Sequence, residues 1–338
     1  MTGLAFSVEA VRLALGDPGV AAVEIAAPFT ASAAEVARLV VRFSDGRDPI
    51  TVIGKAATGP GLAAARRERR FFERIAPLWP HPAPALRGAY EAGDAPQLLL
   101  VTEDLGAAGY ALMTEASVAQ LHAVVDTLVA FHARFWGDLP GELLTGAEPS
   151  SSQSAQAWPT AAITAHAAAA REATARFIAA VELTAAERAL LDRILAAWEP
   201  QFLARVAGGH ALTLIHGDFH LLGNVLFAEH TPQPRVIDWS ELKPGLGPHD
   251  LAYCLHAAPS DQRPTRDLAL LRRYWDGLRA AGIADYGWPL CHWDYQFSLL
   301  TNLFQSVFQR SAFWFRRTAA LIDELAALTA LDTPPPRS

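Results

Sequence analysis

The sequence has 338 residues, 51% hydrophobic and 19% charged, which suits one large two-lobed protein or two ordinary domains and excludes intrinsic disorder for most of the chain. Its formal net charge is −7, and no run of Lys or Arg could follow a phosphate backbone, which argues against a nucleic-acid partner. The cysteines are Cys254 and Cys291, too few for a disulfide framework and without the paired spacing of a zinc site.

The N-terminal segment does not have the order of a signal peptide. It lacks a basic region before an apolar stretch, and Glu9 and Arg12 lie within it. Charges also interrupt every Ala- and Leu-rich window before the ~20 residues needed to cross a bilayer. We therefore expect a cytoplasmic protein with no membrane partner, and no pattern indicates an oligomeric state.

The first third of the chain has the composition of β-strands. β-Favouring runs at 20–26, 35–43 and 50–56 predict a three-strand antiparallel meander, with a turn at 44–49 between the second and third strands. A helix is predicted next, closed by Pro77, because the segment is rich in Ala and Arg and has no breaker.

Two further strands are predicted in GAYEAG and PQLLLVTEDLG, the second ending at Gly106. We place the end of a small N-terminal lobe there, which gives it residues 1–106.

Helical periodicity dominates the rest, residues 107–332, which we assign to a helical C-terminal lobe. Helices are predicted at 116–136, 159–181, 185–207, 262–282, 290–309 and 312–331. The Ser-, Gly- and Pro-rich segment from Gly137 to Pro159 is predicted to be a mobile loop, and the tail 333–338 is expected to be disordered.

A short β interlude interrupts the helices and carries the most informative residues. It reads ALTLIHGDFHLLGNVLF, then a turn at HTPQP, then RVIDW. Asp218, Asn224 and Asp238 therefore lie at strand ends. Phosphoryl transfer needs a carboxylate to accept the proton of the attacking hydroxyl, which suits Asp218. It also needs oxygen ligands for Mg²⁺, which suits Asn224 and Asp238.

This segment resembles the aminoglycoside phosphotransferase and choline kinase-like family, relatives of the protein kinases. The family reads roughly H-G-D-x-H-x-x-N, then I-D-W, then D-L-A. The matching residues here are His216-Gly217-Asp218-Phe219-His220, Asn224, Ile237-Asp238-Trp239 and Asp250-Leu251-Ala252. The resemblance spans residues 20–330 and implies a two-lobed α+β kinase-like fold, with an antiparallel N-terminal lobe and a mainly helical C-terminal lobe. It also implies Asp218 as catalytic base and Asp250 as a carboxylate that braces the loop.

The chain departs from the family at one spacing. The family has its Asn five residues after the catalytic Asp, whereas Asn224 lies six after Asp218, and Gly223 occupies position five. Either the loop bulges by one residue or metal binding has changed. We expect the bulge, because glycine tolerates unusual backbone geometry.

The same scheme requires a strand lysine for the nucleotide phosphates and a helix glutamate to hold it. Lys55 closes the third strand, and the next helix offers Glu68 and Glu73. Glu68 shares a face with the apolar residues three, four and seven positions later, so we expect Glu68 to be buried and to pair with Lys55.

The nucleotide itself is expected to be ATP, with GTP not excluded. No Gly-rich loop covers its phosphates, so backbone amides and the hydroxyl of Thr30 or Ser32 would take that role. The strand LLLVTEDLG resembles the hinge between lobes, whose backbone would bind the purine edge at Thr102, Glu103, Asp104 and Leu105.

The phosphate acceptor is a small-molecule alcohol that the sequence does not identify. In the family it binds between the catalytic loop and the C-terminal helices. By location and polarity the candidates are Trp239, Glu241, His292, Asp294, Asn302 and Gln305. No acidic cluster singles out a polycationic antibiotic. His216 and His220 are expected to support the catalytic loop rather than bind metal, because Mg²⁺ prefers oxygen ligands.

Two alternatives stay open. A catalytically inactive, nucleotide-binding regulator of the same fold would fit the altered Asn224 spacing. Less well supported is an iron-dependent oxygenase that uses His216 and Asp218 as an H-x-D pair, with His249 or His256 as the distal ligand. The long helical segments after residue 117 oppose the oxygenase, which usually has an antiparallel double-sheet roll.

Overall fold

The computed structural model describes residues 5–31, 34–80, 82–93, 96–139, 160–257 and 263–337. Within these ranges the chain forms two compact units. The first unit comprises residues 1–113 together with 224–242, and the second comprises 114–223 together with 243–338. The predicted mobile loop at 137–159 lies mostly outside the described residues, as does Ser32.

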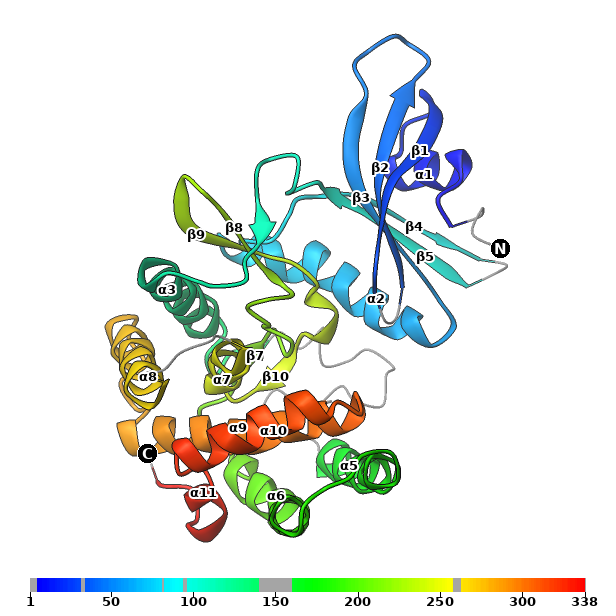
Figure 1. Ribbon diagram of the computed structural model, residues 1–338. Helices are drawn as coiled ribbons and strands as arrows, with labels where there is room; N and C mark the ends of the chain where they lie inside the picture. Colours follow the sequence, from blue (N-terminus) through cyan, green and yellow to red (C-terminus); the bar gives the residue numbers. More distant parts are fainter. Residues whose placement is uncertain are drawn as a thin grey trace. The chain divides into compact units, whose positions relative to one another are not determined.

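The first unit is built on an antiparallel sheet with the strand order β1-β2-β3-β5-β4 (Figure 1). The predicted meander is confirmed, because β2 pairs with both β1 and β3. The two later strands are also found. The bounds are β1 (Val20–Phe29), β2 (Glu35–Phe43), β3 (Ile50–Thr58), β4 (Leu86–Ala92) and β5 (Gln97–Glu103).

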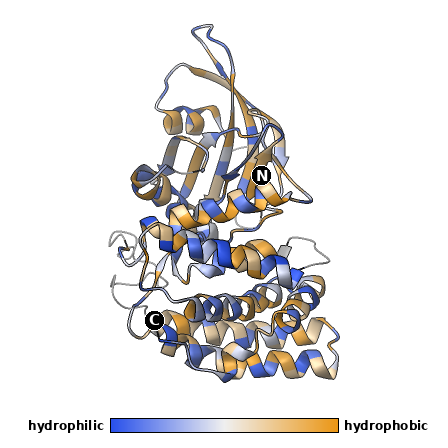
Figure 2. Ribbon diagram, turned by 90° about the vertical axis from the view of Figure 1, so that its left-hand side faces the viewer, coloured by the Kyte–Doolittle hydropathy of each residue, from blue (hydrophilic) through white to orange (hydrophobic). Residues whose placement is uncertain are grey.

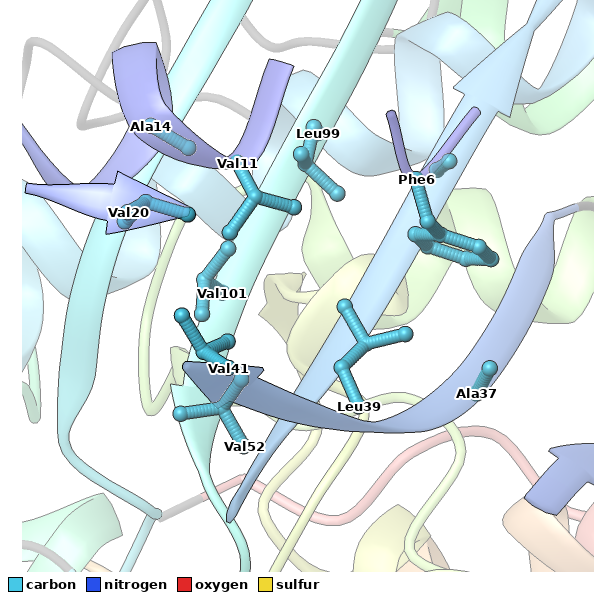
Figure 3. Close-up of a cluster of buried hydrophobic side chains, with 11 residues drawn as sticks. Phe6, Val11, Ala14, Val20, Ala37, Leu39, Val41, Val52, Leu99 and Val101 are labelled. Carbon is cyan, nitrogen blue, oxygen red and sulfur yellow. The ribbon is translucent and has the colours of Figure 1, made fainter. Parts of the chain in front are cut away.

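A helix that the sequence analysis did not predict, α1 (Val8–Leu15), covers part of this sheet. The Ser7 hydroxyl accepts a hydrogen bond from the Ala10 amide and caps its start, and Gly16 ends it in the left-handed conformation with φ 62°. Figure 3 shows Val11 of α1 directed at Leu99 and Val101 of β5. These buried side chains form part of the hydrophobic core of the first unit.

The predicted helix after β3 is found but is not uniform. It runs as α2 (Leu62–Arg70), widens into a π-helical turn, η2 (Phe71–Ile75), and closes with a 3₁₀ turn, η3 (Ala76–Leu78). A π-turn inside a helix shifts the following side chains around the axis and is frequent near functional sites. A separate 3₁₀ turn, η1 (Gly59–Gly61), precedes α2.

A smaller sheet in the first unit has the order β6-β8-β9. Its strands are β6 (Ala111–Leu112), β8 (Val225–Ala228) and β9 (Thr231–Val236). The turn predicted at 230–234 is misplaced, since β9 already begins at Thr231 and contains Pro232 and Pro234. β9 pairs only with β8, and proline is tolerated on such an edge strand because no ladder hydrogen bond is lost.

The second unit is mainly helical, and most of its predicted helices are found. Figure 2 shows hydrophobic and hydrophilic residues interspersed along them, as expected for helices with one buried face. The bounds are α3 (Val118–Arg134), α5 (Thr160–Ala180), α6 (Ala185–Val206), α7 (Pro248–Ala257), α8 (Arg263–Ala280), α9 (Trp288–Phe308), α10 (Ala312–Glu324) and α11 (Thr329–Asp332). The single helix predicted at 312–331 is therefore two, separated where Ala326 adopts a positive φ of 49°.

A two-stranded antiparallel ladder in the second unit joins β7 (Thr213–Ile215) to β10 (Lys243–Gly245). It anchors the loop that follows β7 and contains His216, Gly217 and Asp218. Among the described helices, none is both long enough and apolar enough to span a membrane.

Candidate active site

Lys55 is the centre of the polar cluster in the first unit. Its Nζ lies 2.6 Å from Glu68 Oε2 and 2.7 Å from Asp238 Oδ1. Burial lowers the pKa of the Lys55 ammonium, but the charges of Glu68 and Asp238 outweigh it, so the net pKa is raised and the lysine stays charged. This arrangement fixes a positive charge within β3.

The structure agrees with helical periodicity on which glutamate is buried. Glu68 is 5% exposed and forms the expected ion pair with Lys55, on the same face as the buried Phe71. Glu73 is exposed and pairs instead with Arg69 at 2.7 Å, four residues earlier on the surface. Burial raises the pKa of the Glu68 carboxyl, and the Lys55 charge opposes that rise.

Asp238 follows β9 in a strained backbone conformation, with φ 60° and ψ 66°. Non-glycine residues rarely adopt this left-handed region, and such strain is often found at functional sites. Two contacts hold the segment η4 (Trp239–Glu241). Arg67 Nη1 donates a hydrogen bond to the Ser240 carbonyl at 2.5 Å, and Trp239 stacks on Phe71 with ring centroids 4.0 Å apart. The Asp238 side chain remains 39% exposed.

Asn224 lies at the base of the hairpin formed by β8 and β9. Its carbonyl accepts a hydrogen bond from the Ile237 amide at 2.9 Å, so Asn224 is opposite the residue that precedes Asp238. One amide oxygen and one carboxylate at this end of the hairpin suit Mg²⁺, which binds through few protein oxygens and completes its shell with phosphate and water. The hairpin register thus places Asn224, despite its shifted spacing, opposite Ile237, the residue directly before Asp238.

The expectation that glycine is needed at position 223 for an unusual backbone geometry is wrong. Gly223 does not have a positive φ, whereas Gly217 does, at 82°. The Gly223 amide donates to the His220 carbonyl at 3.1 Å and closes a turn. A Cβ at position 223 would lie 3.2 Å from His220 Nδ1, so close packing against this ring, rather than backbone freedom, favours glycine there.

The catalytic loop of the second unit is braced by Asp250, which is fully buried on α7. Its Oδ2 accepts a hydrogen bond from the His216 amide at 2.7 Å, and its Oδ1 accepts one from the Gly217 amide at 2.9 Å. Burial raises the pKa of the Asp250 carboxyl, but the hydrogen bond and charge of His132 outweigh it and the net pKa is lowered. A buried carboxylate thus fixes the backbone that leads to Asp218.

His132 belongs to this brace and was missed by the sequence analysis. Its Nε2 lies 3.2 Å from Asp250 Oδ2, its Nδ1 lies 2.8 Å from the Tyr274 hydroxyl, and its ring is fully buried. The Thr213 hydroxyl donates a hydrogen bond to the His132 carbonyl at 2.7 Å. The only sequence signal for His132 is its position near the end of a predicted amphipathic helix. A histidine that merely packs in the core would have the same position.

The loop itself presents Asp218 at partial exposure. The Asp218 amide donates a hydrogen bond to His216 Nδ1 at 3.3 Å, and the His220 amide donates to the Asp218 carbonyl at 2.8 Å. His216 is fully buried and packs edge-on against Phe219. Both histidines therefore contact the backbone of the loop around Asp218.

Of the residues expected at the hinge, two have other partners. Asp104 is 5% exposed and bound by Arg38 at 2.6 Å and 3.0 Å. Glu103 is bound by Arg235 at 2.9 Å. Thr102 pairs with Ile53 in the sheet, and the Leu105 carbonyl accepts hydrogen bonds from the Ala108 and Tyr110 amides. The carboxylates of the segment are thus structural. Thr30 is exposed just after β1.

Two of the residues proposed to contact the acceptor are not available for that role. Trp239 is 1% exposed, and its Nε1 donates to the Val236 carbonyl. Asp294 is fully buried on α9 and is held by Arg205 at 2.6 Å and by the Tyr286 hydroxyl at 2.8 Å. Polarity in the sequence did not reveal these partners.

The other acceptor candidates differ in exposure. Glu241 is exposed and lies 3.6 Å from Arg67. His292 is partly buried beside Trp288, Gln305 is exposed, and Asn302 is 3% exposed with neither side-chain polar atom hydrogen-bonded.

The iron-oxygenase alternative is not supported. No group of three or more His, Cys, Asp or Glu side chains in the described part of the chain is arranged to hold a metal ion. Its antiparallel sheets are also not those of a double-sheet roll, since the larger one is covered by a helix and belongs to a unit separate from the helical one.

A sheet unit with a buried lysine–glutamate pair and a helical unit with a braced H-G-D loop define a phosphotransferase of the kinase-like type. The model of the phosphotransferase enzyme family matches residues 31–283, and the chain belongs to this family. A search among curated proteins found no match.

Solved structures with a similar fold are aminoglycoside phosphotransferases. The GDP complex of an aminoglycoside 2'-phosphotransferase-IIIa mutant is 13% identical, with 94% of this chain and 96% of that one covered, at a TM-score of 0.54. The APH(4)-Ia ternary complex with ADP and hygromycin B is 17% identical, with 94% and 98% covered, at 0.51. APH(3'')-Id from Streptomyces rimosus is 20% identical, with 80% and 93% covered, at 0.48. The first two, with TM-scores above 0.5, establish the kinase-like fold and at these identities nothing further.

Proposed function

We propose that the protein transfers the γ-phosphoryl group of ATP to a hydroxyl group of a small molecule. The observation that carries the proposal is Lys55 between Glu68 and Asp238, at 2.6 Å and 2.7 Å. A lysine fixed by a helix glutamate binds nucleotide phosphates in kinase-like enzymes, and the neighbouring aspartate binds their metal.

In this proposal the first unit binds the nucleotide. Asn224 and Asp238 would hold Mg²⁺, which when bound neutralises phosphate charge and positions the γ-phosphate. Lys55 binds the α- and β-phosphates, and Glu68 fixes its direction from a buried position. Backbone groups of residues 102–105 contact the base, and the segment that follows β1, which begins at Thr30, covers the phosphates. The related structures contain GDP or ADP, so GTP is the competing donor to test.

The second unit supplies Asp218 as the proton acceptor. The acceptor hydroxyl loses its proton to the Asp218 carboxylate as its oxygen attacks the γ-phosphorus, and ADP leaves. Asp250 and His132 keep the loop backbone in place, and His216 binds the Asp218 amide. None of these groups needs to form a covalent intermediate, because in-line transfer depends on positioning.

The test compares Asp218→Asn with Asp285→Asn, a change at an exposed aspartate far along the chain. Nucleotide binding is measured by calorimetry, and phosphate transfer is measured from ATP and from GTP across amino sugars, choline-like alcohols, macrolides and steroids. We expect Asp218→Asn to bind nucleotide like the wild type and to lose at least about a thousandfold in transfer, whereas Asp285→Asn keeps both.

An unchanged transfer rate in Asp218→Asn would sink the assignment. The inactive-regulator alternative makes a different prediction for the wild type, namely Mg²⁺-dependent nucleotide binding without turnover on any of the acceptors. The inactive-regulator alternative is supported by the extra residue between Asp218 and Asn224.

A further inference from the structure

Tyr274 of α8 is a buried polar residue that has no part in the proposed reaction. Its side chain is fully buried, and its hydroxyl oxygen lies 2.8 Å from Nδ1 of His132 on α3. Burial is the main cause that raises the pKa of the Tyr274 hydroxyl well above its ordinary value, so the hydroxyl keeps its proton. Tyr274 therefore has a hydrogen to donate to a bare imidazole nitrogen.

The other ring nitrogen of His132 faces a carboxylate. Its Nε2 lies 3.2 Å from Asp250 Oδ2, and neither side chain is exposed to solvent. Because the net pKa of the Asp250 carboxyl is lowered, this group is ionised and only accepts hydrogen bonds. The favourable arrangement has the proton of His132 on Nε2. In the neutral imidazole Nδ1 is then bare, and the Tyr274 hydroxyl is the donor that satisfies it.

The backbone at Gly247 packs directly against this contact. A Cβ at position 247 would overlap the Tyr274 hydroxyl oxygen and would lie 3.2 Å from His132 Nδ1. Gly247 does not have a positive φ, so close approach rather than backbone freedom favours glycine there. A methyl group at this position would push the hydroxyl away from the imidazole.

Asp250 extends the contact to the catalytic loop. The oxygen that faces His132, Oδ2, also accepts a hydrogen bond from the His216 amide at 2.7 Å. The other oxygen, Oδ1, accepts one from the Gly217 amide at 2.9 Å. The Thr213 hydroxyl ties the His132 carbonyl to β7, directly before the loop. A change in how His132 meets Asp250 thus acts on an oxygen that holds the loop backbone two residues before the proposed base.

Loss of the tyrosine hydroxyl would loosen this arrangement. Nδ1 of His132 would be a buried acceptor with its donor removed, and such an atom is costly because it has given up water without a replacement. The imidazole lowers this cost by turning or by moving its proton to Nδ1. Either change takes the Nε2 proton away from Asp250, and a bare Nε2 would repel the carboxylate oxygen.

We propose that Tyr274 is a positioning residue for the catalytic loop: its hydroxyl donates to His132 Nδ1 and thereby directs the protonated Nε2 at Asp250. The inference rests on the proposed function only in that the loop carries Asp218, the proposed proton acceptor. Tyr274 lies outside the segment 216–252 that contains the motifs, so it adds a residue of α8 to the brace.

The first measurement reads the His132 ring in the full chain, grown with isotope-labelled histidine. Nitrogen chemical shifts distinguish protonated from bare imidazole nitrogens, and His132→Gln identifies the signals by their loss. In the wild type we expect a protonated Nε2 and a bare Nδ1 that accepts a hydrogen bond. In Tyr274→Phe we expect the Nδ1 signal to move, either downfield as a bare nitrogen without a donor or upfield as a protonated one.

The second measurement reads the loop by amide hydrogen exchange of a peptide that contains His216 and Gly217. We expect exchange to be about tenfold faster in a folded Tyr274→Phe variant than in the wild type. Gly247→Ala should have the same effect by a different route, because its methyl group displaces the hydroxyl.

Tyr286→Phe is the matched control. Tyr286 is also a buried tyrosine, but its hydroxyl donates to Asp294 at 2.8 Å and not to the brace. Both His132 signals and the loop exchange rate should stay within about twofold of the wild type in this variant. A wild-type ring with its proton on Nδ1 would overturn the inference. So would a Tyr274→Phe variant with an unmoved Nδ1 signal and wild-type loop exchange.

ATP binding and phosphate release from ATP, measured with Mg²⁺ and with water as the acceptor, separate this inference from the proposed function. Phosphate release about tenfold slower in Tyr274→Phe, with unchanged ATP affinity, supports both. A chain whose loop loosens in Tyr274→Phe but whose wild type neither binds nor consumes ATP keeps the positioning role of Tyr274 and loses the proposed function.

Discussion

Lys55 Nζ lies 2.7 Å from Asp238 Oδ1, although 183 positions separate the two residues in the chain. The same ammonium lies 2.6 Å from Glu68 Oε2, so two carboxylates compete for it. A lysine ammonium has three N–H donors, so Lys55 can bind a phosphate and still keep one of these carboxylates. Asp238 is the one more exposed to solvent, at 39% against 7% for Glu68, and is therefore the partner expected to exchange.

The first prediction concerns the fixed partner of the lysine. In Glu68→Gln the buried charge that orients Lys55 is removed, and we expect nucleotide affinity to fall by about tenfold, or about 1.4 kcal/mol. Glu73→Gln changes the exposed glutamate that pairs with Arg69 and is expected to alter affinity by less than about twofold. Calorimetric titration with ATP measures both. Equal losses in the two variants would contradict the role of Glu68.

Metal removal is the second prediction. Asn224 lies opposite Ile237, the residue directly before Asp238, at the base of one hairpin. If both side chains bind Mg²⁺ as proposed, chelation of the metal should weaken ATP binding of the wild type by at least about tenfold. Asn224→Ala should bind ATP more weakly in Mg²⁺ and lose most of this dependence. Gln233→Ala, on the exposed edge of β9, serves as the control. Full Mg²⁺ dependence in Asn224→Ala would mean that the shifted asparagine is not a ligand.

A third prediction follows from the brace of the catalytic loop. Asp250→Asn replaces one acceptor oxygen by an NH₂ group that faces a backbone amide or His132, so the loop loses a hydrogen bond and gains a repulsion. We expect kcat to fall about a hundredfold, which corresponds to about 2.7 kcal/mol, with unchanged ATP affinity. Asp126→Asn, at an exposed ion pair with Arg273, should leave kcat within about twofold.

Much of the fold could be predicted because strands and helices follow from local residue spacing. The burial of Glu68 follows in the same way, since the side chain three residues later, Phe71, lies on its helical face and is itself fully buried. Helix α1 was missed because only eight residues form it, and a segment that short gives little periodicity.

Contacts between distant segments could not be predicted from spacing. Asp294 is a polar residue in a predicted helix of the C-terminal lobe. Its location and polarity are the features by which the sequence analysis chose it as a residue that contacts the acceptor. Its ion-pair partner is Arg205, which lies 89 residues earlier in the chain. The residues around Asp294 in the sequence give no indication of this pair. The same limit applies to Trp239, whose burial depends on stacking with Phe71.

The buried pair itself gives the fourth prediction. Arg205 and Asp294 are 2% and 0% exposed, and Arg205 also donates to the His210 and Ala211 carbonyls. Removing one partner leaves a buried charge, so Arg205→Met should lower the free energy of unfolding by about 3–5 kcal/mol. Chemical denaturation measures the loss. Asp332→Asn breaks an exposed pair with Arg193 and should leave the unfolding midpoint nearly unchanged, so similar losses would contradict the argument.

The last prediction is the pH dependence of stability at His256. Burial is the main cause that lowers its pKa from 6.5 to about 4, and the nearby His220 and Arg317 add to the effect. The folded protein therefore keeps this imidazole neutral, whereas the unfolded chain protonates it below pH 6.5. Its stabilising contribution is present above pH 6.5 and is lost as the pH falls toward 4. That loss reaches at most about 3 kcal/mol.

Replacing the imidazole removes this dependence. In His256→Phe we expect the free energy of unfolding to fall less steeply than in the wild type between pH 7 and pH 4.5, by about 2 kcal/mol. His122→Phe, at an exposed histidine of α3, should keep the wild-type slope. Urea unfolding at a series of pH values gives both slopes. Parallel curves for the wild type and His256→Phe would show that the buried ring does not resist protonation.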